Sequence, residues 1–227
     1  MNGSLLLNTL WVAFGTTFLA LGLGALVAMV LTSIEGLLRQ VLLGLVVATL
    51  ALPPFLLAST WMHYLGAMGV WREWCPLDLY SPAGAILVLS LWLWPVSALA
   101  VWSAWQRLEP AQLEAEPELR GLALFRFLLV PLGRGAGMVA GLITLVLAAN
   151  NLTVPALLQV NVYAAEVWLS FSSTFWVNAD GGLNWRRAAS LTWPLVLLPL
   201  LLMGMLRKRA FPWPTVRGGL PPAAFRR

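Results

Sequence analysis

Side chains that usually do chemistry are scarce in this 227-residue chain. It has one histidine, His63, one cysteine, Cys75, and one lysine, Lys208. A metal site needs several convergent ligands, and no His, Cys or carboxylate cluster surrounds His63 in the sequence. The lysine lies between two arginines, which excludes a phosphate-binding loop of the GxxxxGK[ST] type. We therefore expect no catalytic residues, no bound cofactor or metal, and no ATP hydrolysis by this chain itself.

Charge is concentrated in one stretch. Residues 106–134 hold eight of the 23 charged residues (14 basic and 9 acidic), and four of the eight are glutamates. Long uncharged blocks flank the stretch on both sides, and a charged side chain at mid-bilayer costs at least about 2.5 kcal/mol. This charged loop is therefore expected in water on one face of a membrane, where it could bind a soluble partner.

The remaining chain is apolar enough for an integral membrane protein. Hydrophobic residues make up 60% of it and charged residues 10%, against about 25% charged residues in soluble domains. Five continuous uncharged blocks can each supply the roughly 20 residues of a spanning helix. They predict an all-α fold, a polytopic membrane helical bundle of about five transmembrane helices. The expected helices cover residues 4–31, 41–64, 82–105, 135–152 and 188–206.

These helices and their connections form one expected transmembrane domain, residues 1–206. The charged loop, residues 106–134, connects the third and fourth helices. Residues 153–187 are only moderately apolar and are predicted to form a re-entrant or interfacial segment on the outer side. The basic tail, residues 207–227, is rich in Pro, Gly and Arg and is expected to be loosely ordered.

The distribution of Lys and Arg predicts the orientation. With five spans, the set of loops that includes the charged loop and the tail carries eleven of these residues, and the opposite set carries three. Basic residues favour the cytoplasmic side, so the N-terminus is expected outside and the C-terminus in the cytoplasm. The pI near 10.3 then reflects membrane anchoring and not nucleic-acid binding, because no basic run is interleaved with stacking aromatics.

Two polar or irregular sites within the apolar blocks could line a pathway. Pro53 and Pro54 fall in the middle of the second expected helix, where they remove two backbone donors and should kink or unwind it. Asn150 and Asn151 place two amides at the end of the fourth block, at a depth where polar groups often face a cavity. The alternatives are a kink tolerated by packing, and amides that cap a helix or bond between helices.

Small residues predict where helices approach closely. The first expected helix contains Gly15, Gly22 and Gly24, and the fourth has Gly137 and Gly141 at GxxxG spacing. Both patterns permit tight helix packing in a membrane, although GxxxG is a weak signal on its own.

The charged loop resembles the EAA loop of permease subunits of binding-protein-dependent ABC importers. Residues 110–121 (PAQLEAEPELRG) and 129–132 (LVPL) carry this resemblance. Residues 8–10 (NTL) are similar to the family's opening, and residues 152–160 (LTVPALLQV) to a segment of its ferric-iron and thiamine type. The resemblance covers about residues 4–206 and implies the MetI-like, type I importer permease fold.

The loop departs from the family pattern in three ways. Residues 115–117 (AEP) stand where Glu-Ala-Ala is expected, with Glu114-Ala115 one position earlier. The spacing from Gly121 to Pro131 is about three residues short, and Pro117 divides the loop into two pieces. The family often has one more helix before the core, so the chain is either a five-helix member or part of a split or truncated permease.

The resemblance implies a mechanism and partners. Two permease subunits, as a homodimer or heterodimer, would form the pathway in a bacterial cytoplasmic (inner) membrane, in contact with membrane lipid. ABC ATPase subunits carrying ATP and Mg would dock on the charged loops, and an extracytoplasmic binding protein would deliver ferric iron or another small solute. The residues implied in ATPase coupling are Pro110, Glu114, Ala115, Glu116, Gly121, Leu124, Phe125 and Pro131.

Two functions of other classes remain open. A secondary transporter or channel would need no ATPase, but ionisable residues that could relay protons are scarce within the spans. A membrane scaffold or assembly factor would bind a partner and move nothing. Co-purification of a nucleotide-binding subunit with the chain would distinguish an ABC importer permease from these two alternatives.

Overall fold

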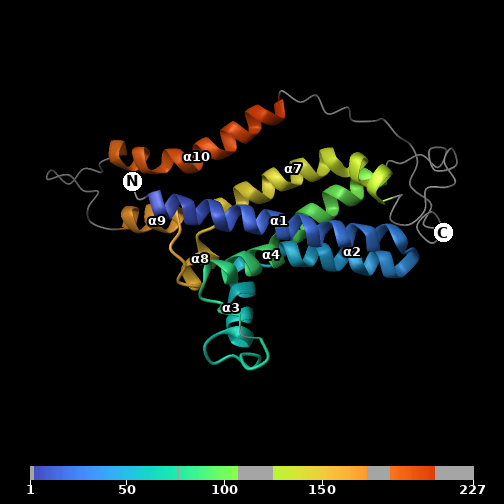
Figure 1. Cartoon of the computed structure of the whole chain (residues 1–227), viewed down its shortest axis with the longest axis horizontal. Coiled ribbons are helices and arrows are strands. Elements are labelled where there is room, and N and C mark those ends of the chain that lie inside the picture. Colours follow the sequence, from blue (N-terminus) through green and yellow to red (C-terminus); the bar gives the residue numbers. More distant parts are fainter. Residues whose placement is uncertain (1–2, 76, 107–124, 173–184, 208–227) are drawn as a thin grey trace. The chain divides into compact units, whose positions relative to one another are not determined.

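The computed structural model describes residues 3–75, 77–106, 125–172 and 185–207. Every regular element in these ranges is a helix, which confirms the predicted all-α fold. Three helical stretches are long and apolar enough to cross a membrane: Gly3–Ser33, Pro82–Trp105 and Phe125–Ala149. A fourth span results if the bent pair Gly36–Ala51 and Pro54–Leu65 counts as one. The protein is thus a membrane protein with several apolar helices (Figure 1).

The first and third spans are single helices. Helix α1 covers Gly3–Ser33 and helix α4 covers Pro82–Trp105. Neither contains a charged side chain, and Pro82 suits the start of α4 because its missing N–H would have no helical partner there. Pro95 lies inside α4 without ending it, as neighbouring elements in a membrane protein permit.

The second span is broken. The single helix expected over residues 41–64 consists of α2, Gly36–Ala51, and α3, Pro54–Leu65, which meet at an angle of 96°. Leu52 and Pro53 between them have extended backbone, with ψ of 131° and 135°. Pro53 and Pro54 cannot donate to the carbonyls one turn earlier, which ends α2, whereas Pro54 fits the first position of α3.

The fourth helix begins earlier than expected. A π-helix, η1, covers Phe125–Leu129, and α7 follows over Val130–Ala149. Residues 125–134, predicted as part of the charged loop, are therefore helical. Arg126 and Arg134 suggested a loop, but charged side chains are tolerated near the end of a spanning helix, where they reach the membrane surface. Pro131 is the second residue of α7 and follows η1 without a gap, so its missing N–H removes one donor to the carbonyls of η1.

Three shorter or irregular helices complete the described chain. They are α8, Thr153–Leu157, α9, Tyr163–Ser172, and α10, Trp185–Arg207. The segment expected to be re-entrant or interfacial thus contains two short helices, while its residues 173–184 lie outside the described ranges. Within α10, the described apolar stretch Thr192–Leu201 is shorter than a span, and the helix includes Pro194 and Pro199.

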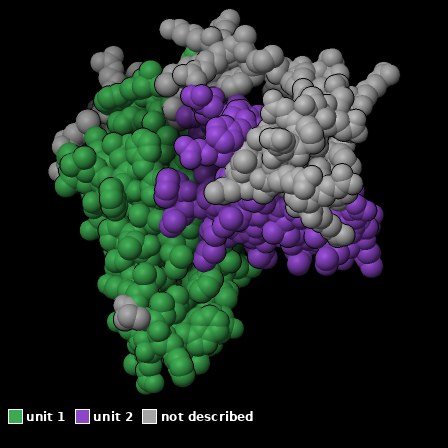
Figure 2. All heavy atoms as spheres, turned by 45° about the vertical axis from the view of Figure 1, so that its right-hand side comes forward, with its two compact units in different colours: residues 1–17, 53–90, 145–209 green, residues 18–52, 91–144, 210–227 purple. Residues whose placement is uncertain are grey.

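The chain divides into two compact units (Figure 2). Helices α1, α4 and α7 each contribute residues to both units. Unit 1 contains residues 1–17, 53–90 and 145–209. Within it α3 packs on α8, and α9 packs on α10. Unit 2 contains residues 18–52, 91–144 and 210–227. Its core includes a buried cluster of Ala28, Val101, Trp105 and Leu129.

Glycines of α1 bring this helix close to α4 in each unit. In unit 2, a Cβ at Gly24 would lie 2.5 Å from Ser97 Cβ and 2.7 Å from the Ala98 backbone nitrogen. In unit 1, a Cβ at Gly15 would lie 2.6 Å from Ile86 Cδ1. Gly22 and Gly137 have open space at this position. Close packing therefore uses two of the three predicted α1 glycines, and Gly137 of the GxxxG pair is not in a tight contact.

Candidate functional site

The charged loop leaves α4 after Trp105 and returns at η1, and these two points define its base. Of the residues implied in ATPase coupling, Phe125 and Pro131 are described. The others, Pro110, Glu114, Ala115, Glu116, Gly121 and Leu124, lie outside the described residues. The site can therefore be built from its base, which lies in unit 2.

The base is held together by one side chain. Trp105, the last residue of α4, is 2% exposed, and its indole N–H donates to the Leu129 carbonyl at 2.9 Å. Its ring also meets the Phe125 ring edge to face, with centroids 6.4 Å apart and planes at 80°. An aromatic pair in this geometry is worth about 0.5–1.5 kcal/mol beyond its burial. Trp105 thus joins the last turn of α4 to both ends of η1.

Gly133 makes room for this arrangement. It is buried in the second turn of α7, and a Cβ there would lie 2.8 Å from Trp105 Nε1. That separation is too short for a carbon next to a nitrogen that donates elsewhere. We call Trp105, Phe125, Leu129 and Gly133 the Trp105 clasp.

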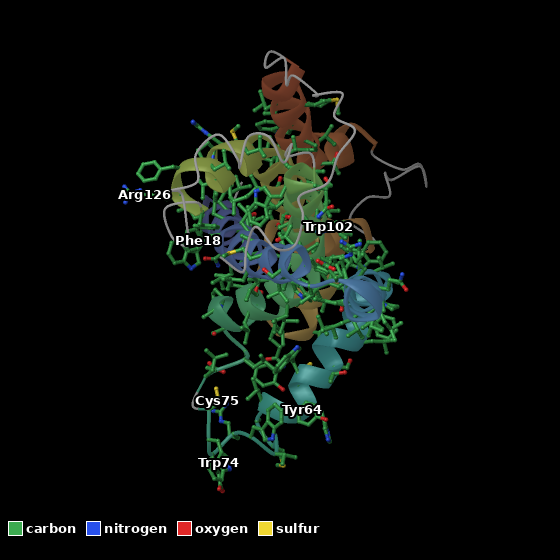
Figure 3. All side chains as sticks on the ribbon, turned by 90° about the vertical axis from the view of Figure 1, so that its right-hand side faces the viewer. Phe18, Tyr64, Trp74, Cys75, Trp102 and Arg126 are labelled. Atoms are coloured by element: carbon green, nitrogen blue, oxygen red, sulfur yellow. The ribbon has the colours of Figure 1, made fainter. Side chains whose placement is uncertain are left out.

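The surface beside the clasp is both apolar and basic. Phe127 is 67% exposed, and the Arg126 guanidinium lies 6.0 Å from the centre of its ring. Arg126 projects outward from η1 (Figure 3). Pro131 is exposed one turn later. An exposed aromatic ring with a neighbouring arginine is a combination enriched at protein interfaces.

The proline break has a second tryptophan bond. Trp92 of α4 donates its indole N–H to the carbonyl of Leu52, the last residue before Pro53, at 3.0 Å. Pro53 itself is exposed and Pro54 is half-buried. The N–H of Leu56, which would bond Leu52 in a continuous helix, donates instead to the Pro53 carbonyl at 3.0 Å. Trp92 therefore supplies the donor that the break removes from Leu52.

Asn150 and Asn151 lie at the end of α7 in unit 1. The Asn150 amide nitrogen donates back to the Val146 carbonyl at 2.9 Å, and the residue is exposed. The Asn151 amide oxygen accepts the Val154 N–H at 3.0 Å, in the first turn of α8. These bonds correspond to the capping alternative. They do not occupy the amide nitrogen of Asn151, so a role in a pathway remains a prediction.

The opening motif of the chain contacts the segment after α8. The buried Thr9 hydroxyl accepts the Tyr163 N–H at 2.8 Å and donates to the Leu5 carbonyl at 2.8 Å. The Asn8 amide nitrogen donates to the Asn161 carbonyl at 3.4 Å. Burial raises the pKa of the Tyr163 phenol above its ordinary value near 10, so the side chain stays neutral at physiological pH. Residues 8–10, which resembled the opening of a permease, therefore bond to residues that directly follow the second resembling segment, residues 152–160, in unit 1.

Sequence reasoning missed the clasp. Trp105 was predicted only as an aromatic residue of the third helix, and Gly133 only as part of the charged loop. The hydrogen bond between Trp92 and the proline break was not predicted. The available signal was the position of Trp105 as the last apolar residue before the charged loop. A metal site was not expected, and the part of the chain that the structure describes contains no group of three or more His, Cys, Asp or Glu that could hold one.

The comparisons with known proteins support the fold alone. No protein-family model matches the sequence, and no curated protein matches it. The structure is similar to a chain of the methionine ABC transporter MetNI, solved in inward-facing conformations, with a TM-score of 0.64. The match covers 90% of this chain and 94% of that chain at 16% sequence identity. The chain therefore has the fold of a chain of an ABC transporter over nearly its whole length.

Proposed function

We propose that this chain is a permease subunit of an ATP-driven ABC importer. The observation that carries the proposal is the structural match to a chain of MetNI, which extends over nearly all of both chains. A chain with three or four apolar helices long enough to span a membrane corresponds to the membrane part of such a transporter, because an ATP-hydrolysing subunit is a soluble protein with a phosphate-binding loop. This chain has no such loop.

The proposed partners follow from this assignment. A second permease subunit, identical or different, completes the pathway, and ATPase subunits with bound ATP and Mg dock on the charged loop. The exposed ring of Phe127 and the neighbouring Arg126 add an apolar and a basic contact beside the loop. An extracytoplasmic binding protein delivers the solute. Conformational changes of the ATPases then reach the helices as rigid-body motion.

Co-purification tests the ATPase contact. The tagged chain is co-expressed with the ABC ATPase subunits of its own organism, extracted in mild detergent and analysed by mass spectrometry. We expect one ATPase subunit to be recovered, and to be lost when Glu114 and Gly121 are both replaced by alanine. Replacement of Glu73 and Gly22 by alanine is the matched control, because Glu73 belongs to the opposite set of loops and a Cβ added at Gly22 would meet open space. Recovery of the chain without any ATPase would refute the proposal.

The proposed orientation can be tested with the natural cysteine. Cys75 is free and half-buried, and it lies next to the exposed Trp74 in the segment after α3 (Figure 3). If this segment lies outside and the charged loop in the cytoplasm, a membrane-impermeant maleimide added to intact cells should label Cys75. A cysteine introduced at Arg126 in a Cys75→Ser chain should be labelled after the membrane is opened. The reverse pattern would invert the proposed topology.

The proposed substrate is a small solute, with ferric iron as the candidate that residues 152–160 suggest. Methionine is a second candidate, because it is the solute named for the transporter with the similar fold. Uptake of radiolabelled ferric iron and methionine into proteoliposomes that contain the assembled complex would decide between them. Uptake that follows an ion gradient without ATP would instead support a secondary transporter.

A further inference from the structure

The Trp105 clasp closes the base of the charged loop. Trp105 precedes the loop and Phe125 follows it, yet their rings are in contact with centroids 6.4 Å apart. The residues at which the chain enters and leaves the loop are therefore held together by contact between a buried ring, Trp105, and a half-buried ring, Phe125. Ala28 and Val101 complete the buried cluster around them.

The clasp lies where the hydrogen-bond pairing of the fourth span changes from π-helical to α-helical. Leu129 is the last residue of the π-helix, and α7 starts at the next residue. Single π-turns within α-helices are rare and occur frequently at functional sites. The change from π to α pairing is an irregular point of the helix, at the place where the charged loop joins the membrane span. The Trp105 N–H bonds the carbonyl at this change and not elsewhere in the helix.

A neighbouring tryptophan, Trp102, lies at the same cluster without forming a bond like that of Trp105 in the part of the chain that the structure describes. Trp102 lies three residues before Trp105 and packs against the same cluster. Its indole nitrogen is buried and has no hydrogen-bond partner within the described ranges. Of two buried indole N–H groups in one cluster, only that of Trp105 thus joins two helices. Trp102→Phe can therefore serve as the control for Trp105→Phe, because both variants remove an indole nitrogen from the same cluster.

We propose that the Trp105 clasp makes the last turn of α4 and the first turn of α7 move as one body, so that displacement of the charged loop reaches both helices together. Trp105 and Gly133 are then positioning residues for energy coupling and contact neither ATP nor solute. The inference rests on the proposed function where it names ATP coupling, whereas the mechanical joint can be tested on the chain alone.

Phenylalanine at position 105 tests the bond. Trp105→Phe keeps an aromatic ring against Phe125 and removes the indole N–H. Gly133→Ala keeps the indole but places a carbon within 2.8 Å of its nitrogen. Trp102→Phe, which removes an N–H with no hydrogen-bond partner among the described residues, is the control. In the double variant Trp105→Phe/Gly133→Ala the smaller ring leaves room for the new methyl group, and the bond is already absent.

Transport coupling is the first measurement. ATP hydrolysis and solute uptake are measured on the same proteoliposomes, which contain the complete complex with its ATPase subunits. In Trp105→Phe and Gly133→Ala we expect uptake per ATP hydrolysed to fall by about 2- to 30-fold, the range for residues that modulate coupling between sites. ATPase recovery in co-purification should be unchanged, as should both activities of Trp102→Phe. The double variant should be no worse than the worse single variant.

Two outcomes on the complex would overturn the proposal. Unchanged uptake per ATP in Trp105→Phe would show that the bond does not serve coupling. Multiplied effects in the double variant would show that Trp105 and Gly133 act separately. Failure of the wild-type chain to recover an ATPase is a different result, because it refutes the proposed function and leaves the joint to be judged by the next measurement.

A distance measurement on the chain alone is the second test. Spin labels are placed at the exposed positions Ser103 and Arg126 in a Cys75→Ser background, which removes the natural cysteine. The distance distribution should be narrow in the wild-type sequence and in Trp102→Phe, and broader in Trp105→Phe and Gly133→Ala. A distribution that stays equally narrow in Trp105→Phe would overturn the clasp whether or not an ATPase binds.

Discussion

Two tryptophans of α4, thirteen positions apart, donate their indole N–H to main-chain carbonyls at interruptions of other helices. Trp92 bonds Leu52 at 3.0 Å beside the proline break, and Trp105 bonds Leu129 at 2.9 Å at the π-to-α register change. The bonds have nearly the same length and chemistry. They differ in their surroundings, because Leu52 is 43% exposed whereas Leu129 is 1% exposed.

The difference shows that the same type of indole-to-carbonyl hydrogen bond has different consequences at the two sites. In a lipid environment a carbonyl without an intrahelical donor must find another donor, and tryptophan supplies one from an apolar side chain. If the proline break lines a water-filled pathway, as predicted, water can replace a lost indole at Leu52, and the bond then compensates for a local irregularity. At Leu129 the site is buried, and the carbonyl faces the Gly133 N–H one turn later in the same helix, so loss of the indole removes the bond between two helices in a place that water cannot enter. We therefore expect the two bonds to differ in their contribution to stability.

Removal of the whole Trp105 side chain should have the largest effect. Trp105→Ala empties a buried site and breaks both the hydrogen bond and the ring contact with Phe125. Substitutions of buried tryptophan by alanine usually destabilise by about 3–5 kcal/mol. The unfolding midpoint in detergent should fall strongly, while Trp11→Ala, at a tryptophan 69% exposed, should change it little. Equal midpoints for the two variants would mean that the ring is not buried in the assembled protein.

Removal of only the Trp105 N–H should have the next largest effect. Trp105→Phe removes a buried hydrogen bond between two helices, while the Leu129 carbonyl keeps the Gly133 N–H as a donor within its own helix; we expect a cost of about 1–1.5 kcal/mol, at the upper end of the range for a single hydrogen bond. Trp102→Phe should be neutral or slightly stabilising, because it removes a buried donor that is not bonded within the described ranges. Thermal unfolding of both variants in one detergent measures the difference. A larger loss for Trp102→Phe would reverse the assignment of the two indoles.

The elements of the fold were largely predictable because they follow from charge and chain length. A bilayer excludes charged side chains, so uncharged blocks such as residues 79–106 delimit helices such as Pro82–Trp105. Pro53 and Pro54 predicted a break, because the loss of two donors is a local property. Its angle of 96° depends on packing and could not be read from the two prolines. The early start of the fourth helix was missed because Arg126 and Arg134 were interpreted as loop residues.

The candidate site was less predictable because its contacts are not local. Trp105 meets Leu129 and Gly133 across 24 and 28 positions, and no spacing rule relates them. Glycine patterns were equally ambiguous: Gly24 is in a tight contact, while Gly137 has open space. Most residues of the charged loop that carried the family resemblance lie outside the described residues, so their proposed contact with an ATPase stays a prediction.

A third interruption, the end of α8, is closed without tryptophan. Gln159 has a φ of 56°, and the N–H groups of Gln159 and Val160 donate to Ala156 and Pro155. This is the usual closing pair of a helix C-terminus, in which glycine normally occupies the left-handed position. Left-handed backbone costs about 1–2 kcal/mol for other residues, so Gln159→Gly should raise the free energy of unfolding by about 1 kcal/mol.

Two comparison variants sharpen this prediction. Gln159→Ala keeps the strain and should give no gain in thermal stability. Gly36 also has a positive φ, of 66°, with open space at its Cβ position, so Gly36→Ala should destabilise by a similar amount. If Gln159→Gly proves destabilising instead, the Gln159 side chain makes a favourable contact that exceeds its backbone strain.

Trp92→Phe should have the smallest effect, about 0.5 kcal/mol, at the lower end of the range for a single hydrogen bond. Leu52 is 43% exposed, so water in a pathway at the proline break could replace the indole there, whereas the bond at Leu129 lies in a buried site that water does not enter. In a Pro53→Ala/Pro54→Ala chain the N–H groups return, Leu56 can close on Leu52, and Trp92→Phe should then have no measurable effect on the unfolding midpoint. If Trp92→Phe instead matches Trp105→Phe in the natural chain, exposure does not set the strength of these bonds, and the proline break is as firmly held as the clasp.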